Sequence, residues 1–279
     1  MIPLLRIELY KIFRRPRTYI AFATVSAIAI LIQVAMLVDG EAFVEFAFHS
    51  IGEQFEFGGN LLNGYLITYL VLQSLLVHVP LLVALVAGDG LAGEAAGGTL
   101  RLLLTKPIGR GRVVMAKFFA AVIYATLLLI WLAIVGLGLS LLLFGESDMI
   151  HLKSDQVVFL LKDDLLWRYA AAFAFAAVTM TCIAALALFL SAFADNSIGP
   201  IVSTVGIVIF FTIVSNLGLP AFDRIAPALF TTHLIGWKGF FSDPVPWGDI
   251  SVSALILIGY AALFLAATIF YFNRKDIQS

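Results

Sequence analysis

Charged residues are scarce in this chain: only 13% of its 279 residues are Asp, Glu, Lys or Arg, and the formal net charge is −1. A soluble domain usually carries about 25% charged residues. The near-zero net charge gives no sign of the basic surface that binds nucleic acid, so no nucleic-acid partner is expected. The apolar fraction is 62%, which indicates that membrane lipid surrounds most of the chain.

Reactive residues are also few. The one cysteine, Cys182, lies in an apolar segment, which excludes an intramolecular disulfide framework and a CxxC metal site; we expect it to be a packing residue. The motifs GxxxxGK[ST], GxSxG and HExxH are absent, so no P-loop, hydrolase or metalloprotease site is expected. The sequence therefore predicts no catalytic residue, no metal and no cofactor in this chain.

Long apolar segments dominate the sequence. A helix needs about 20 apolar residues to cross the hydrocarbon core, and six segments qualify: residues 18–38, 61–87, 118–144, 169–193, 198–219 and 251–272. Their continuous apolar runs favour helices over alternating barrel strands. We expect an all-α membrane protein with six transmembrane helices in a single domain over residues 1–279. Because no Asp, Glu, Lys or Arg falls within these spans, a proton-driven carrier or a channel with a charged filter is disfavoured.

The basic residues are unevenly placed. Six spans put both termini on one side, and twelve of the 17 Lys and Arg residues belong to that side: Arg6, Lys11, Arg14, Arg15, Arg17, Arg101, Lys106, Arg110, Arg112, Lys117, Arg274 and Lys275. The positive-inside rule then places both termini in the cytoplasm, and we expect a multi-pass protein of a bacterial cytoplasmic membrane. Residues 3–15 predict an amphipathic helix on the membrane surface that ends at Pro16; a merely basic flank is the alternative.

Two external segments carry structure of their own. Residues 157–167 (VVFLLKDDLLW) predict a short helix beside the membrane. Residues 220–248 are rich in aromatic residues, among them Phe230, Trp237, Phe240, Phe241 and Trp247, and contain four prolines, and aromatic side chains favour the bilayer interface. A re-entrant or interfacial element and a packed external cap both fit this composition.

Uncharged polar residues mark two of the spans. Tyr69, Gln73 and His78 lie in the second span, and Thr212 and Asn216 share a face of the fifth. One hypothesis is that these helices line a translocation cavity. The alternative is ordinary hydrogen bonding between helices, worth about 0.6 kcal/mol for each bond. We do not expect His78 to bind a metal, because no second ligand stands near it in sequence.

Residues 88–117 form the most distinctive stretch, with a glycine-rich entry, a short apolar run and a basic exit. The pattern resembles the cytoplasmic loop of ABC-2-type transporter permeases, the membrane subunits of ABC exporters. The topology agrees with the same family over nearly the whole chain. The resemblance implies a coupling helix between spans two and three that docks on a separate ATPase, and the docking residues would be Glu94, Gly98, Thr99, Leu100, Leu103, Leu104, Pro107 and Arg110.

Local chemistry agrees with a docking helix. Thr99 is a suitable N-cap, Gly98 allows a sharp entry, and Leu100, Leu103 and Leu104 are apolar anchors for a groove on a partner. The resemblance further implies two ATPase chains that carry the ATP and Mg, and a second permease chain, identical or different. Lys117 is expected at the cytoplasmic lipid surface.

The stretch departs from the family at residues 95–97, which are uncharged where many relatives carry charges, and at Arg101, where an acidic residue is common. This leaves open which ATPase the stretch fits. A polytopic membrane scaffold and an intramembrane lipid-modifying enzyme remain as alternatives. The enzyme would need a cluster of polar residues within the spans, and the sequence contains none.

Overall fold

The computed structural model describes residues 1–52, 61–99, 108–153, 156–216 and 224–275. Within this part, six helices are long and apolar enough to cross a membrane, judged by length and composition. The elements in chain order are α1 (Ile2–Phe13), α2 (Pro16–Gly52), α3 (Gly64–Ala87), α4 (Asp89–Ala96), α6 (Arg110–Leu132), the π-helix η1 (Ala133–Gly138), α7 (Leu139–Phe144), β1 (Met149–Lys153), β2 (Gln156–Leu160), α8 (Lys162–Phe193), α9 (Ile198–Asn216), η2 (Ala226–Ala228), α11 (Phe230–His233), η3 (Gly236–Phe241) and α12 (Trp247–Arg274).

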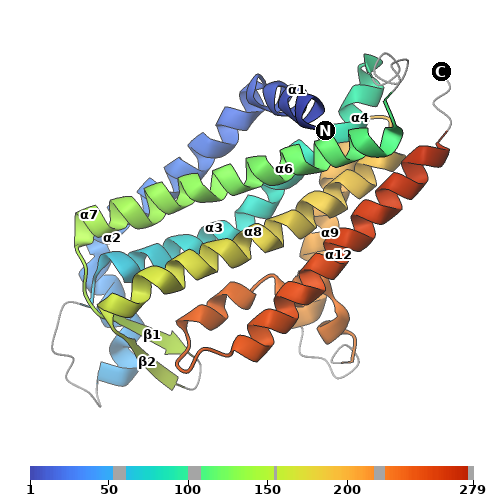
Figure 1. Cartoon of the computed structure of the whole chain (residues 1–279). Coiled ribbons are helices and arrows are strands. Elements are labelled where there is room, and N and C mark those ends of the chain that lie inside the picture. Colours follow the sequence, from blue (N-terminus) through green and yellow to red (C-terminus); the bar gives the residue numbers. More distant parts are fainter. Residues whose placement is uncertain (53–60, 100–107, 154–155, 217–223, 276–279) are drawn as a thin grey trace.

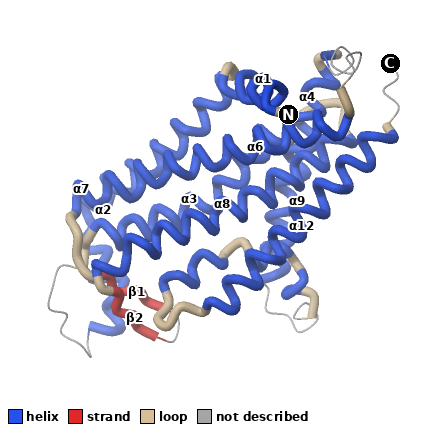
Figure 2. The backbone as a smooth tube through the Cα atoms, viewed as in Figure 1, coloured by secondary structure: helices blue, strands red, loops and turns tan. Residues whose placement is uncertain are grey.

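The long helices form one bundle around α8 (Figure 1). This helix contacts α3, α6, α9 and α12. Its buried side includes Ala172, Ala176, Ala184 and Ala187, and such small residues let neighbouring helices approach closely in a membrane. The short elements gather at the two ends: α1 and α4 lie at one end, and the β1–β2 hairpin lies at the other (Figures 1 and 2).

The predicted N-terminal helix is confirmed as α1. It ends at Phe13, before Pro16, and it packs across the first turns of α6. Phe13 meets Tyr124 of α6 with 6.5 Å between ring centroids. Ile12 and Phe13, at the end of α1, therefore pack against the core of the bundle.

The six predicted spans are confirmed as helices, but several extend beyond their apolar cores. The first helix bends at Asp39 (φ −123°, ψ 17°) and continues to Gly52. It therefore extends well beyond residue 38, where the predicted span ends. The second begins at Gly64, because the side chain of Asn63 caps it by accepting the N–H of Leu66 at 3.0 Å. The third and fourth begin earlier than expected, at Arg110 and Lys162, because polar residues extend a helix past the hydrocarbon core.

The short helix expected over residues 157–167 is corrected by the structure. Residues 156–160 form β2, which pairs antiparallel with β1 in a register that places Met149 opposite Leu160. The β-branched residues Val157 and Val158 favour this strand. Only the residues from Lys162 onward are helical, as the first turns of α8.

A π-helix interrupts the third span at residues 133–138. Wide turns of this kind leave backbone carbonyls open to other donors. The fully buried Gln33 of α2 donates its side-chain amide to the carbonyls of Val135 at 2.9 Å and Gly136 at 3.2 Å, and to Ser140 at 2.9 Å. A polar side chain is thus accommodated at a helix contact inside the apolar bundle.

The aromatic-rich segment packs on the bundle near the hairpin end. Phe241 of η3 is fully buried and lies edge-on to Tyr69 and Tyr169, with ring centroids 5.2 and 4.8 Å apart. Arg168 fixes the segment, since its guanidinium donates to the carbonyls of Phe240 and Ser242 at 2.8 Å each. The described part, residues 224–246, is built from short helical turns.

Candidate functional site

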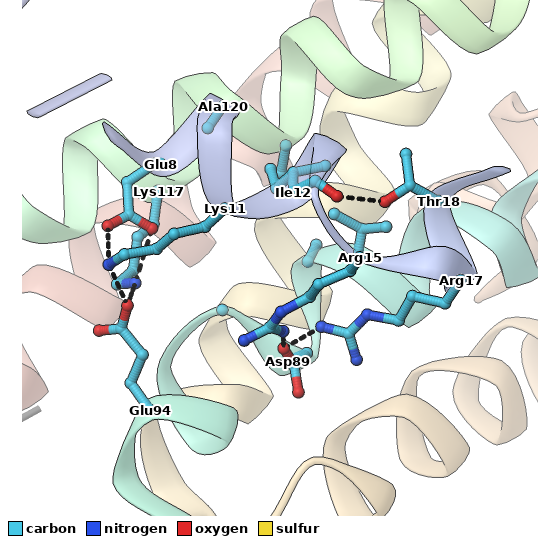
Figure 3. A pocket seen from close by; sticks show the side chains of 14 residues that line it. Glu8, Lys11, Ile12, Arg15, Arg17, Thr18, Asp89, Glu94, Lys117 and Ala120 are labelled. Carbon is cyan, nitrogen blue, oxygen red and sulfur yellow. Dashed lines mark hydrogen bonds and ion pairs between the residues drawn. The ribbon is translucent and has the colours of Figure 1, made fainter. Parts of the chain in front are cut away.

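Seven charged side chains meet where α1, the start of α2, α4 and α6 come together (Figure 3). We call them the ion cluster: Glu8, Lys11, Arg15, Arg17, Asp89, Glu94 and Lys117. They surround a small cavity of about 40 Å³. The short helix α4 supplies both central carboxylates, because Asp89 and Glu94 lie on its buried side.

One half of the cluster is a neutral quartet of two amines and two carboxylates. The amine of Lys117 lies 2.7 Å from Glu94 and 2.9 Å from Glu8. The amine of Lys11 contacts the same two carboxylates, at 2.7 and 2.8 Å. The Lys117 side chain is only 3% exposed, whereas that of Lys11 is 38% exposed. Charges this deeply buried are stable only when they are paired.

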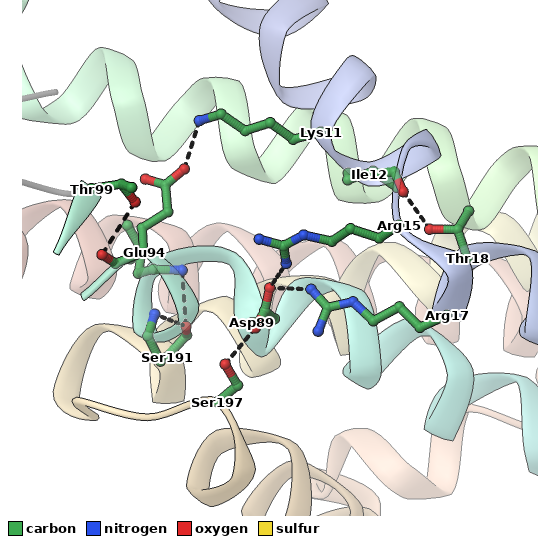
Figure 4. A network of polar contacts seen from close by, with 12 residues as sticks. Lys11, Ile12, Arg15, Arg17, Thr18, Asp89, Glu94, Thr99, Ser191 and Ser197 are labelled. Carbon is green, nitrogen blue, oxygen red and sulfur yellow. Dashed lines mark hydrogen bonds and ion pairs between the residues drawn. The ribbon is translucent and has the colours of Figure 1, made fainter. Parts of the chain in front are cut away.

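The other half is centred on Asp89, which accepts from Arg15, Arg17 and Ser197. Ser191 of α8 accepts the backbone N–H groups of Leu91 at 3.0 Å and Ala92 at 2.9 Å. These N–H groups belong to the first turn of α4. The start of α4 is therefore attached to α8 and to the α8–α9 connection (Figure 4).

The two carboxylates of the quartet change the pKa of Lys11. Burial alone would lower the pKa of this amine, but its hydrogen bonds and charge interactions with Glu8 and Glu94 outweigh burial and raise the pKa above 10.5. Lys11 therefore stays charged at neutral pH and holds α1 against α4.

Sequence reasoning missed this cluster and placed two of its members elsewhere. The family resemblance assigns Glu94 to the surface that docks on an ATPase, but its carboxylate contacts Lys11 and Lys117 of the same chain. The sequence also assigns Lys117 to the lipid surface, but the residue is 5% exposed. The reason is that α1 folds over α6 and covers both residues. The only sequence signal was that acidic and basic residues flank the same spans.

The remaining docking residues follow α4 directly. Gly98 has a φ of +67°, a conformation that favours glycine. The Thr99 hydroxyl donates to the carbonyl of Glu94 at 3.4 Å. Leu100, Leu103, Leu104 and Pro107 lie outside the described residues.

Arg110 opens α6 and contacts the end of α12. Its guanidinium donates to the carbonyls of Phe272, Asn273 and Lys275 at 3.2, 3.3 and 2.7 Å. These are terminal carbonyls of a helix, which lack partners within the helix. Arg110 thereby joins the exit of the predicted docking stretch to the C-terminal helix.

The polar residues of the second and fifth spans are brought together in part. Gln73 and Thr212 both line a cavity of about 350 Å³ between α3, α8, α9 and η3. Tyr69 lies nearby and packs on Trp237 at 5.6 Å between centroids. His78 is exposed on α3, with a ring nitrogen 2.7 Å from the carbonyl of Ser74. The side chain of Asn216 lies outside the described structure.

The described ranges contain no group of three His, Cys, Asp or Glu residues that could hold a metal ion. Cys182 is buried in α8 as a free thiol, in agreement with its expected packing role. The charged groups of the ion cluster are mutually paired, so the arrangement suits a mechanical connection between segments.

Comparison with known proteins adds family information. Over 68 residues, 24% of this chain and 25% of the relative, the sequence is 43% identical to the probable ABC transporter permease protein NosY of Stutzerimonas stutzeri. A 40-residue match, 14% of each chain, is 52% identical to the protein of the same description from Pseudomonas aeruginosa. The uncharacterized protein YhcI of Bacillus subtilis is 23% identical over 201 residues.

These matches span 25%, 14% and 63% of the relatives' lengths, so the likeness to the permeases rests on short stretches. The profile of DUF2705, a family described as a protein of unknown function, matches residues 26–278. That range covers most of the chain, including all six long helices except the first ten residues of α2. The chain therefore belongs to the DUF2705 family.

Proposed function

We propose that this chain is the membrane-spanning permease subunit of an ATP-driven exporter, and that a separate ATPase docks on residues 97–107. The short similarity to probable ABC transporter permeases supports the class of protein. The observation that carries the proposal is the anchoring of α4 by the ion cluster. The helix immediately before the docking stretch is joined by charge to α1 and α6, and by hydrogen bonds to α8.

The anchoring of α4 includes a buried ion pair, between Glu94 and Lys117, whose side chains are 8% and 3% exposed. Removing one partner of such a pair costs about 3–5 kcal/mol. Shifting a two-state equilibrium from 1:99 to 99:1 takes about 5.5 kcal/mol, which is of the same order. A displacement of residues 97–107 would therefore move α4 together with α1 and α6, and so change the packing of the bundle.

Topology and partners follow from the same proposal. The proposed membrane is the bacterial cytoplasmic membrane, and the excess of Lys and Arg at the end that holds α1 and α4 supports a cytoplasmic location for that end. ATP and Mg bind to the ATPase, and this chain contributes no catalytic residue. Two permease chains, identical or different, and two ATPase chains form the transporter.

Co-purification tests the proposal. The tagged chain is solubilised gently and the proteins that accompany it are identified, for the wild type and for Leu103→Asp. Leu102→Asp is the matched control, because Leu102 lies off the predicted apolar face of Leu100, Leu103 and Leu104. We expect a P-loop ATPase with the wild type and the control, and its loss with Leu103→Asp. Absence of any ATPase under several mild detergents would contradict the proposal.

A further inference from the structure

The cavity between α3, α8, α9 and η3 has features that the permease proposal does not assign. Its volume of about 350 Å³ lies at the lower end of the range of about 300–1,000 Å³ that is usual for ligand pockets. Its walls are mainly apolar, with a few polar groups contributed by different elements: Gln73, Thr179, Thr212, Thr231 and Lys238. This combination is typical of a small-molecule site.

Thr179 lacks a partner that other threonines of the bundle have. It is 3% exposed, and its hydroxyl finds no hydrogen-bond partner among the described residues. In contrast, Thr181 and Thr204 donate to the carbonyls four residues earlier, at 2.8 and 2.7 Å. A buried hydroxyl without a partner is costly and rare. Thr179 is part of the cavity wall, although its hydroxyl oxygen itself is buried.

Lys238 supplies a positive charge without a balancing carboxylate. It lines the cavity from η3, and burial lowers the pKa of its amine. In the described part of the chain, Lys238 has no ion-pair partner, whereas Lys11, Lys117, Arg168 and Lys275 each have one. Its amine lies 5.9 Å from the ring of Trp237. A half-buried cation with no counter-charge favours an anionic ligand.

The apolar walls determine the other part of the ligand. Leu76, Val77, Met180, Val208 and Leu234 contribute side chains without charge or hydrogen-bonding groups. We propose that this cavity binds an amphiphile with one acyl chain, whose anionic head lies at Lys238 and whose chain lies along these residues. The binding site does not depend on the permease proposal, because it requires no ATPase.

Quenching of tryptophan fluorescence tests the site. The purified full chain is placed in nanodiscs of phosphatidylcholine and titrated with undecanoate brominated close to its carboxyl end, a quencher of nearby tryptophans, because Trp237 lies beside Lys238. Trp237 lines the cavity, so Trp237→Phe should remove the saturable part of the quenching. The uncharged methyl ester of the same acid is the matched ligand.

Two variants separate charge from shape. Lys238→Gln should weaken binding of the carboxylate about tenfold or more, since a hydrogen bond to a charged group is lost, and should leave binding of the ester unchanged. Lys162→Gln, an exposed lysine at the same end of the bundle, is the control and should bind as the wild type does. Equal binding of carboxylate and ester to the wild type, or unchanged carboxylate binding in Lys238→Gln, would overturn the proposal.

Adding phosphatidylglycerol to the nanodiscs identifies the source of the ligand: competition indicates an anionic membrane lipid, and its absence indicates a free amphiphile.

Discussion

Replacing Lys117 by methionine is expected to release α1 from α6 and α4. The amine of Lys117 is the most buried charge of the quartet and contacts both Glu8 and Glu94. Its removal leaves two carboxylates that share the half-exposed Lys11. Breaking a buried pair costs about 3–5 kcal/mol. We expect the free energy of local opening at α1 to fall by about 3 kcal/mol, at the lower end of that range, because Lys11 still compensates one of the two charges.

A cysteine at Ala120 reports the release of α1. Ala120 is fully buried in α6 and lines the same cavity as Ile12 of α1 (Figure 3). In a Cys182→Ala background, a thiol at position 120 reacts with a soluble reagent only when α1 moves away, so the labelling rate follows the free energy of local opening. A change of 3 kcal/mol corresponds to an increase of about two orders of magnitude in the rate.

Lys11→Met is the matched control, since it removes an amine that contacts the same two carboxylates. Its side chain is 38% exposed, and ion pairs near water contribute about 0–1 kcal/mol, so the rate should rise only a few-fold. If labelling in Lys117→Met is no faster than in Lys11→Met, burial does not make the quartet strong, and the reasoning is refuted.

Three further predictions follow from other polar contacts. Arg168→Met should lower the thermal midpoint and expose η3 to protease, because the carbonyls of Phe240 and Ser242 lose their donor; an unchanged cleavage pattern would contradict this. Gln33→Leu should lower the free energy of unfolding by about 1–3 kcal/mol in unfolding titrations, because two hydrogen bonds to η1 and one to Ser140 of α7 are lost at about 1 kcal/mol each, while one unpaired amide oxygen is removed. The pKa of Lys11 is raised on folding, so the stability that its charged amine adds to the fold is fully present below pH 10.5 and is lost as the pH rises through the higher pKa of the folded state. The difference in thermal midpoint between wild type and Lys11→Met should therefore be constant from neutral pH to about pH 10 and shrink above it.

The apolar periodicity of the chain predicted its helices well, because each span is a local property of about 20 consecutive residues. The bend at Asp39 falls at the end of the first predicted span. The helix over residues 3–15 and its stop before Pro16 were also predictable, since the ring of proline blocks continuation. The positive φ of Gly98 agrees with the expected sharp turn.

The ion cluster could not be predicted, because it joins residues far apart in sequence. Lys117 and Glu8 are 109 positions apart, and only the packing of α1 on α6 brings them together. The π-helix and its contact with Gln33 depend on packing in the same way. The strand at residues 156–160 was missed because its apolar run is as compatible with a helix as with a strand.

The most direct test of the permease proposal is a cross-link from the docking stretch. A photoreactive amino acid is placed at Leu103 in cells that express the tagged chain, and a second sample carries it at Leu142, which is 84% exposed on α7 near the opposite end of the bundle. The account predicts that position 103 forms a covalent adduct with a P-loop ATPase and that position 142 does not. No ATPase adduct at position 103, or the same adduct at both positions, would contradict it.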